Sequence, residues 1–370
     1  MKKTRAQIHK EAEECFYEND FKGILCISQR VGKTYISCMI IKKIINLYPK
    51  LPIDVYVPFV NLIEETWKPE LIKWLGCVPE NINFKTHKSI NKEKDFNKNF
   101  QIIDEIHLLS NQNMTKFVLA ERVLGLTGTM NEQTRFDVSN ILNLDIIYEY
   151  SVIEAVKDGI IADFIVNVVY CDLDNKIKNI PSGSLSNPFY STERSYYDYL
   201  TKVFEHYKEL AYTNPFNNKN KRFASDKRMR FIYSSKTKIN NVKYFLNKNK
   251  NEKVLIFASN IKTAEYLSKY SYHSKSKEDN LAKFNENKFN HLSCCKMLNV
   301  GVTIPKLHKI VIQQLTSNEE NTSQILARAL NLEYEGKVAE INIFCIRNTV
   351  DEVWVKKSLS WIPDEKINYL

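Results

Sequence analysis

Short apolar runs alternate with segments of helical spacing through most of the chain. An apolar run at residues 23–27 and an alternating segment at residues 53–57 flank residues 33–47, where apolar side chains recur with the period of a helix. Strand, helix and strand in this order predict a parallel sheet covered by helices. Further apolar runs at residues 254–257 and 309–312 repeat the pattern. The sequence therefore predicts two consecutive α/β units.

The chain of 370 residues is long enough for two domains. We expect the first at residues 1–165 and the second at residues 226–370, with a linker or insertion at residues 166–225. Residues 172–222 read as irregular chain around one helix at residues 196–210. Two cores leave little chain for a further domain such as a nuclease or zinc domain.

The turn after the first predicted strand has the residues of a phosphate-binding loop. It reads SQRVGKT from Ser28 to Thr34 and leads directly into a helix. Such a loop needs backbone N–H groups at a helix N-terminus, a lysine for the phosphates and a hydroxyl for Mg²⁺. Gly32, Lys33 and Thr34 supply the last three positions, whereas Ile27 stands where the full pattern has glycine. The strand–turn–helix context favours a functional loop over a chance tripeptide.

Two acidic residues, Asp104 and Glu105, end a later apolar run. A phosphate-binding loop of this type works with one carboxylate that holds Mg²⁺ through water and a second that polarises the attacking water. Asp104 fits the first role and Glu105 the second. His107 is expected to couple sites and not to bind metal, because no other His or Cys lies at ligand spacing.

Six segments in this order resemble the motifs of superfamily 2 helicases and translocases of the DExH or DEAH-box type. They are Gln29–Thr34 for motif I, Asp104–His107 for motif II, Leu126–Met130 for motif III, Val254–Asn260 for motif IV, Asn299–Pro305 for motif V and Gln324–Asn331 for motif VI. Within this superfamily the chain resembles phage branch-migration helicases and Swi/Snf-like ATPases. The resemblance implies two tandem RecA-like domains, each a parallel sheet flanked by helices, with an ATP cleft between them.

The resemblance also implies cofactors and residue roles. It implies ATP and Mg²⁺, with ATP bound by Gln7, Gln29, Arg30, Val31, Gly32, Lys33 and Thr34 and with the metal held by Thr34 and Asp104. It assigns catalysis to Lys33, Asp104, Glu105, Gln324 and Arg328. It assigns nucleic-acid contacts to Asn61, Thr86, Ser259, Asn260 and Thr303, and coupling to His107, Thr127 and Thr129.

Two positions depart from the family pattern. Thr303 replaces the aspartate of motif V, and Asn331 replaces the second arginine of motif VI, which leaves Arg328. An arginine that reaches the transferred phosphoryl group is worth about 10³–10⁵ in rate. Slow hydrolysis is therefore expected, unless Arg30 or Arg347 substitutes.

The predicted function is an ATP-dependent DNA helicase or translocase in replication, recombination or repair. Its expected partners are single-stranded, duplex or branched DNA and proteins of replication or recombination, with no membrane. Open alternatives are an ATP-binding nucleic-acid clamp with weak hydrolysis, an RNA helicase and the motor of a restriction system. The bias toward Lys, Asn and Ile suggests a phage or another AT-rich genome. With no signal peptide and no CxxC pair, a cytoplasmic protein is expected, in the host if phage-encoded.

The positive charge of the chain is concentrated in one segment. The formal net charge is +10, and residues 219–253 carry 12 basic and 2 acidic residues, so this segment holds the whole excess. Aromatic residues interleave with the basic ones. One interpretation is an electrostatic footprint for nucleic-acid phosphates. The other is a solvated, lysine-rich face without a partner.

Overall fold

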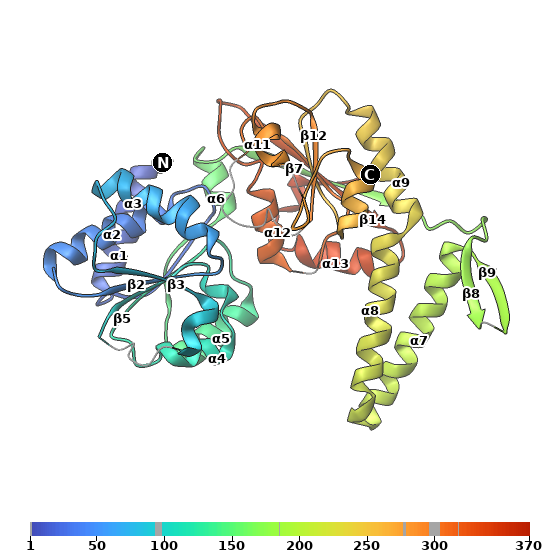
Figure 1. Cartoon of the computed structure of the whole chain (residues 1–370), viewed down its shortest axis with the longest axis horizontal. Helices are drawn as coiled ribbons and strands as arrows, with labels where there is room; N and C mark the ends of the chain where they lie inside the picture. The colour runs from blue at the N-terminus through green and yellow to red at the C-terminus, as the bar shows by residue number, and fades with distance from the viewer. Residues whose placement is uncertain (1, 93–97, 185, 277–278, 296–303, 317) are drawn as a thin grey trace. The chain divides into compact units, whose positions relative to one another are not determined.

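The computed structural model describes residues 2–92, 98–184, 186–276, 279–295, 304–316 and 318–370. The chain forms two compact units, each built on its own sheet (Figure 1). The first contains Met1–Asp163 and also Glu319–Lys337, and the second contains Phe164–Leu298, Ile304–Asn318 and Val338–Leu370. Sheets flanked by helices confirm the predicted α/β class.

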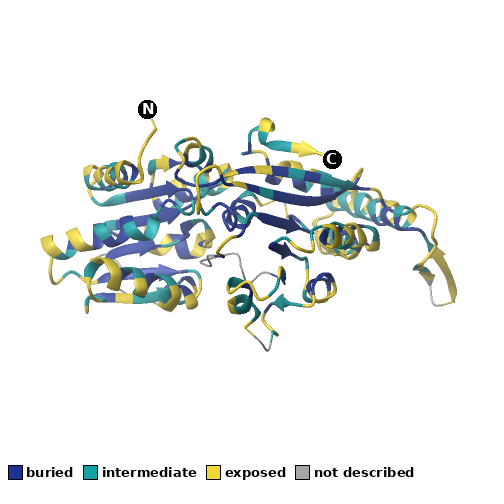
Figure 2. Ribbon diagram, turned by 90° about the horizontal axis from the view of Figure 1, so that it is seen from above, coloured by how far each residue is buried: buried dark blue, intermediate teal, exposed yellow. Residues whose placement is uncertain are grey.

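The first unit contains a parallel sheet of six strands among its described residues, in the order β3-β2-β4-β5-β1-β6. The strands are β1 (Lys22–Ile27), β2 (Ile53–Val57), β3 (Ile82–Thr86), β4 (Phe100–Ile103), β5 (Arg122–Thr127) and β6 (Ile146–Tyr150). Every residue of β2 and β4 is buried, as expected for parallel strands with both faces covered (Figure 2). Their mostly apolar sequences reflect this burial, and the polar exceptions, Asp54 in β2 and Gln101 in β4, are buried as well.

Helices cover both faces of this sheet (Figure 1). The longer helices of the unit are α1 (Arg5–Glu18), α2 (Lys33–Leu47), α3 (Lys68–Leu75) and α5 (Glu132–Leu142). The shorter ones are η1 (Ile63–Trp67), η2 (His87–Lys92), η3 (Ile106–Leu108), α4 (Asn111–Met114), η4 (Thr115–Phe117) and α6 (Val152–Lys157). Helix α12 (Glu319–Leu326) belongs to the same unit but is not one of the helices shown against the sheet (Figure 1). Helix α2 packs against both α1 and α3. These contacts hold the start of α2, and thus the predicted phosphate loop, against α1.

The second unit contains a sheet in the order β11-β12-β10-β13-β14-β7-β15. Its strands are β7 (Asp163–Cys171), β10 (Val254–Phe257), β11 (Ser271–Tyr272), β12 (His291–Cys294), β13 (Lys309–Ile312), β14 (Val338–Ile346) and β15 (Ile367–Tyr369). Helices α9 (Lys236–Lys248), α10 (Ile261–Leu267), α11 (Asn280–Asn285) and α13 (Val350–Ser358) and the short η6 (Asp364–Lys366) belong to the same unit. Among the described residues, no helix combines the length and apolarity that crossing a bilayer requires.

A helix covers the predicted residues 196–210, but the prediction of irregular chain in the rest of residues 172–222 was wrong. This region forms a hairpin of β8 (Ile180–Ser184) and β9 (Asn187–Ser191), then α7 (Glu193–Thr213), the short η5 (Pro215–Asn217) and α8 (Asn218–Ser234). Arg228, on the buried face of α8, lies over the Phe204 ring of α7 at 4.1 Å. A buried face that includes an arginine does not show as apolar periodicity, so α8 escaped detection. The chain therefore has an accessory helical hairpin that was not expected.

Three of the twelve basic residues in the segment 219–253 are buried and have partners inside the second unit. Arg228 packs on Phe204, and Lys253 donates hydrogen bonds to the Asn287 side chain at 2.8 Å and to the Pro305 carbonyl at 2.9 Å. Lys238 pairs with Asp351. The exposed cations are Lys219, Arg222, Lys227, Arg230, Lys236, Lys248 and Lys250. The surface charge of the segment is therefore smaller than its sequence suggests.

Lys238 is expected to stabilise the second unit. Its side chain is fully buried, and its Nζ lies 2.7 Å from a carboxylate oxygen of Asp351. Lys238→Met leaves that carboxylate buried without its counter-charge, which costs about 3–5 kcal/mol in the free energy of unfolding. The exposed Lys236 is the matched control, and Lys236→Met is expected to change it by less than about 0.5 kcal/mol. Urea unfolding measures both, and equal losses would contradict a structural role for Lys238.

Candidate nucleotide-binding site

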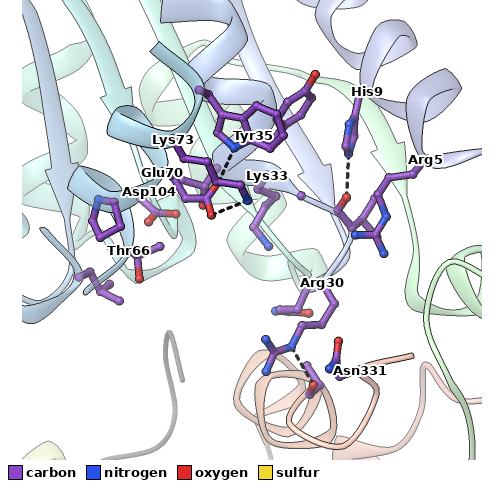
Figure 3. Close-up of a pocket in the computed structure, with 18 of the residues that line it drawn as sticks. Arg5, His9, Arg30, Lys33, Tyr35, Thr66, Glu70, Lys73, Asp104 and Asn331 are labelled. Atoms are coloured by element: carbon purple, nitrogen blue, oxygen red, sulfur yellow. Dashed lines mark hydrogen bonds and ion pairs between the residues drawn. The ribbon is translucent and has the colours of Figure 1, made fainter. Parts of the chain in front are cut away.

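A cavity of about 910 Å³ in the first unit contains most of the residues predicted to bind and hydrolyse ATP (Figure 3). Of the predicted residues, its lining includes Gln29, Arg30, Val31, Gly32, Lys33, Thr34, Asp104, Glu105, Gln324 and Arg328. The lining also includes residues with no predicted role at the site, among them Arg5, His9, Tyr35, Glu65, Thr66, Glu70, Lys73 and Trp74. The structure thus brings together residues from both ends of the chain.

The loop between β1 and α2 is shaped by a glycine whose backbone conformation disfavours every other residue. Gly32 has a φ of 120° at the start of α2, and a Cβ there would lie 2.8 Å from Nε2 of His9. The same His9 nitrogen forms a hydrogen bond of 2.8 Å with the Val31 carbonyl. Helix α1 therefore braces the loop while α2 presents its first N–H groups, which have no partners within the helix.

Lys33 lies at the centre of this cavity (Figure 3). Its Nζ donates a hydrogen bond of 3.1 Å to the carbonyl of Ile27, at the end of β1. Its positive charge favours the ionised forms of Asp104 and Glu105. It therefore opposes the rise in pKa that burial causes in both carboxyls. One cation thus faces two acids that come from the neighbouring part of the sheet.

Asp104 and Glu105 are buried acids whose pKa values are raised. Burial, and then the charge of Glu105, raise the pKa of Asp104 to about 6, although the Trp67 Nε1–H donates to one Asp104 oxygen at 3.0 Å. Burial also raises the pKa of Glu105, while the charges of Lys33 and Arg328 oppose this. Within the described part of the chain, Oε2 of Glu105 accepts no hydrogen bond. Burying two acids side by side costs folding free energy, and acids with pKa values shifted in this way cluster at functional sites.

Asp104 should therefore lower the stability of the fold at neutral pH. Because its folded-state pKa is raised, its stabilising contribution is present below its ordinary value of 3.8 and is lost as pH rises through about 6. Asp104→Asn removes the buried charge and should raise the free energy of unfolding at pH 7.5 by about 1–3 kcal/mol. Thermal unfolding at pH 7.5 and pH 5 tests this. A gain that does not shrink at the lower pH would contradict it.

The three predicted coupling residues form a connected chain. Nδ1 of His107 lies 2.9 Å from the Thr127 hydroxyl, which donates its proton to the Thr129 carbonyl at 2.8 Å. Because that hydroxyl proton is used, Nδ1 of His107 must be the donor. Burial lowers the pKa of His107 to about 4, so the ring is neutral at pH 7. These hydrogen bonds link the segment after β4 to the end of β5 and the loop that follows it.

The segment Glu319–Lys337 packs against the phosphate loop within the first unit. Arg30 donates from Nε to the Ala327 carbonyl at 3.3 Å, and the Ser323 hydroxyl donates to the Gln29 side chain at 3.3 Å. Arg328 is close enough to lower the pKa of Glu105. Asn331, which stands in place of an expected arginine, also lines the cavity.

Other predicted residues lie outside this cavity. The Gln7 side chain closes a capping box with Thr4 at the start of α1, so it is engaged there. Asn61 is exposed and donates to Glu65 at 3.1 Å, and Thr86 ends β3. Ser259 and Asn260 begin α10 in the second unit, where Asn260 caps the helix. Thr303 lies outside the described residues.

Sequence reasoning gave Trp67 and His9 no role at this site. Trp67 is fully buried, and its indole N–H binds Asp104, although the two residues are 37 positions apart. His9 follows Arg5 by four positions, so both lie on one face of α1. That spacing was the one feature of the sequence that could have placed both residues at the cavity. A pair of residues four positions apart on a helix does not by itself indicate contact with a distant loop.

Comparisons with known proteins agree with this geometry. Residues 237–332 match the helicase conserved C-terminal domain. The DNA 3'-5' translocase XPB2 of Sulfurisphaera tokodaii is 23% identical over 84% of this chain and 74% of its own length.

Two solved structures share the fold. The Pyrococcus furiosus Hef helicase domain matches with a TM-score of 0.53 at 14% identity, covering 96% of this chain and 97% of its own. Dbp5 of S. cerevisiae, bound to RNA and ADP BeF3, matches with a TM-score of 0.57 at 12% identity. The match covers 98% of this chain and 89% of the Dbp5 chain. Two sheets of this kind, with the domain match and the relative, confirm the predicted resemblance to superfamily 2 helicases and translocases. The resemblance to phage and Swi/Snf-like members stays a prediction.

Proposed function

We propose that this protein is an ATP-dependent DNA translocase or helicase that remodels DNA in replication, recombination or repair. The observation that carries the proposal is the cavity of the first unit, where the loop Gly32–Thr34, the acids Asp104 and Glu105, and Arg328 line one space. A phosphate loop, two acids and an arginine are the parts that phosphoryl transfer from a nucleotide requires.

The residues present fit a magnesium nucleotide. Gly32, with its φ of 120°, turns the loop into the N-terminus of α2, and Glu105 keeps a buried oxygen without a hydrogen bond among the described residues. No group of three or more His, Cys, Asp or Glu within the described ranges could hold a metal by itself. Mg²⁺ suits such a site, because it takes one or two protein ligands together with phosphate oxygens and waters. Thr34 and Asp104 would provide those ligands.

Each residue then has a distinct task. Bound ATP supplies the phosphoryl group that water accepts. Lys33 offsets phosphate charge, as it now offsets the charges of the two acids. Glu105 takes the proton of the attacking water, a role that suits a carboxyl whose pKa is raised toward neutrality. Arg328, with Gln324, stabilises the charge that develops on the transferred group.

DNA is the proposed substrate because the exposed cations of the segment 219–253 suit phosphates and the XPB2 relative is named a DNA translocase. The residues Asn61, Thr86, Ser259, Asn260 and Thr303 remain candidate contacts to its backbone. The match to Dbp5 bound to RNA keeps RNA as the alternative substrate.

A nucleic-acid clamp with weak hydrolysis is the second candidate function. Asn331 favours it, because an amide lines the cavity where the family pattern has a second arginine. Arg30 is the better-placed substitute, since it lines the same cavity, whereas Arg347 belongs to the second unit and lies over the Tyr170 ring at 4.7 Å. Phosphate release by Arg30→Ala and by Arg347→Ala separates their roles.

Lys33→Ala tests the proposed nucleotide site. The substitution should weaken ATP binding and lower phosphate release by about 100-fold or more, because the other loop cation, Arg30, is turned toward the Ala327 carbonyl and does not take the place of Lys33. Lys42→Ala, on the exposed side of the same helix, is the matched control and should leave both unchanged. Fluorescent-nucleotide binding and phosphate release measure the two effects. Equal activity of wild type and Lys33→Ala would contradict the proposal.

A further inference from the structure

Three aromatic side chains are exposed where the helices α7 and α8 meet. These helices lie side by side as a long hairpin (Figure 1), with η5 between them. Tyr212 is 86% exposed, Phe216 91% and Phe223 70%. We call residues 212–223, which comprise the end of α7, η5 and the start of α8, the hairpin tip. A cluster of large apolar side chains this exposed is unusual on a folded protein.

The fold of the tip does not depend on these rings. The Asn214 side chain accepts a hydrogen bond of 3.0 Å from the backbone N–H of Phe216, and the Thr213 hydroxyl donates to the Leu210 carbonyl at 3.1 Å. An aromatic ring stabilises a fold in proportion to the area that it removes from water, and these rings remove little. The aromatic residues at the tip therefore need another explanation.

Basic residues accompany the aromatic rings. Lys219, Phe223 and Lys227 follow one another at intervals of four on α8, so they share one face of the helix, and all three are exposed. Arg222 is exposed beside them, and Asp226 is the one acid in the sequence of α8. The tip thus offers exposed aromatic rings with positive charge on the α8 side, whereas Glu209 is an exposed acid on the α7 side.

We propose that the hairpin tip binds unpaired stretches of nucleic acid, with Tyr212, Phe216 and Phe223 stacking on bases and with Lys219 and Arg222 contacting phosphates. Aromatic faces next to cations are the chemistry that binds single strands without sequence preference. A continuous duplex hides its base faces by stacking, so it offers this surface only its phosphates. The inference rests on the proposed function, because it takes nucleic acid as the substrate, and it adds recognition of unpaired bases.

The test compares a single strand with a duplex. A variant combining Tyr212→Ala, Phe216→Ala and Phe223→Ala should lose about 5- to 100-fold in affinity for oligothymidylate. Its affinity for a blunt duplex should change by less than about twofold, because the phosphate contacts remain. Fluorescence anisotropy at one salt concentration gives both affinities. Thermal unfolding should match that of wild type, since the rings are exposed.

Phe136→Ala is the matched control, because Phe136 is 65% exposed on α5 in the first unit. It should leave both affinities unchanged. Equal binding of oligothymidylate by the triple variant and wild type would overturn the inference, and so would an equal loss on single strand and duplex. If wild type binds neither nucleic acid, the proposed function itself fails, which is a different result.

Discussion

Glu105→Gln will lower nucleic-acid-stimulated phosphate release by about 10²–10⁴-fold, the contribution typical of a positioned general base. Glu105 is 7% exposed, with its Oε2 lacking a hydrogen bond among the described residues, and its pKa is raised by burial. An amide of the same shape cannot accept the proton of water. ATP binding should persist or strengthen, because the substitution removes a negative charge beside the phosphates.

Glu121→Gln is the matched control for this result. Glu121 is exposed in the first unit, where it pairs with its neighbour Arg122 at 3.2 Å, away from the cavity. Its phosphate release should equal that of wild type. Retained activity in Glu105→Gln would remove Glu105 from the proposed role and point to Asp104, the acid that precedes it after β4, as the next candidate.

Neutralising the exposed cations of α8 will weaken DNA binding and flatten its salt dependence. The variant replaces Lys219, Arg222, Lys227 and Arg230 with Gln and spares the buried Arg228. For every phosphate that the protein no longer neutralises, the slope of log K against log salt should fall by about 0.9 on duplex DNA. Nucleotide binding at Lys33 should not change. Anisotropy titrations at several salt concentrations measure the slope.

A charge-matched control separates a specific footprint from net charge. Lys50, Lys88, Lys98 and Lys116 are exposed in the first unit, and replacing them with Gln removes the same four charges. The control should keep a steeper slope than the α8 variant. Equal slopes would show that the α8 cations are a solvated face without a partner.

The sequence predicted the elements whose burial is continuous. Strands β1, β2, β4, β10 and β13 are buried along most of their length, so their sequences are mostly apolar, with Asp54 in β2 and Gln101 in β4 as buried exceptions. The phosphate loop was predictable because it combines a required glycine, a lysine and a hydroxyl in consecutive positions. Local rules of this kind need no knowledge of distant contacts.

The remaining features depend on contacts between distant residues. Lys238 and Asp351 are 113 positions apart, so sequence alone counts the lysine as surface charge when it is buried. Trp67 reaches Asp104 for the same reason. The aromatic tip was missed because exposure is a property of the folded hairpin. What the sequence could not reveal was therefore the division of charged and aromatic residues between interior and surface.

Phosphate release from ATP by the wild-type protein, measured without nucleic acid and with single-stranded, duplex and forked DNA and RNA, tests the central claim most directly. For a DNA translocase we expect slow basal phosphate release that DNA stimulates, with the stimulation lost in Lys33→Ala. Release that no nucleic acid stimulates would contradict a translocase and favour a clamp, and stimulation by RNA alone would contradict the proposed DNA substrate.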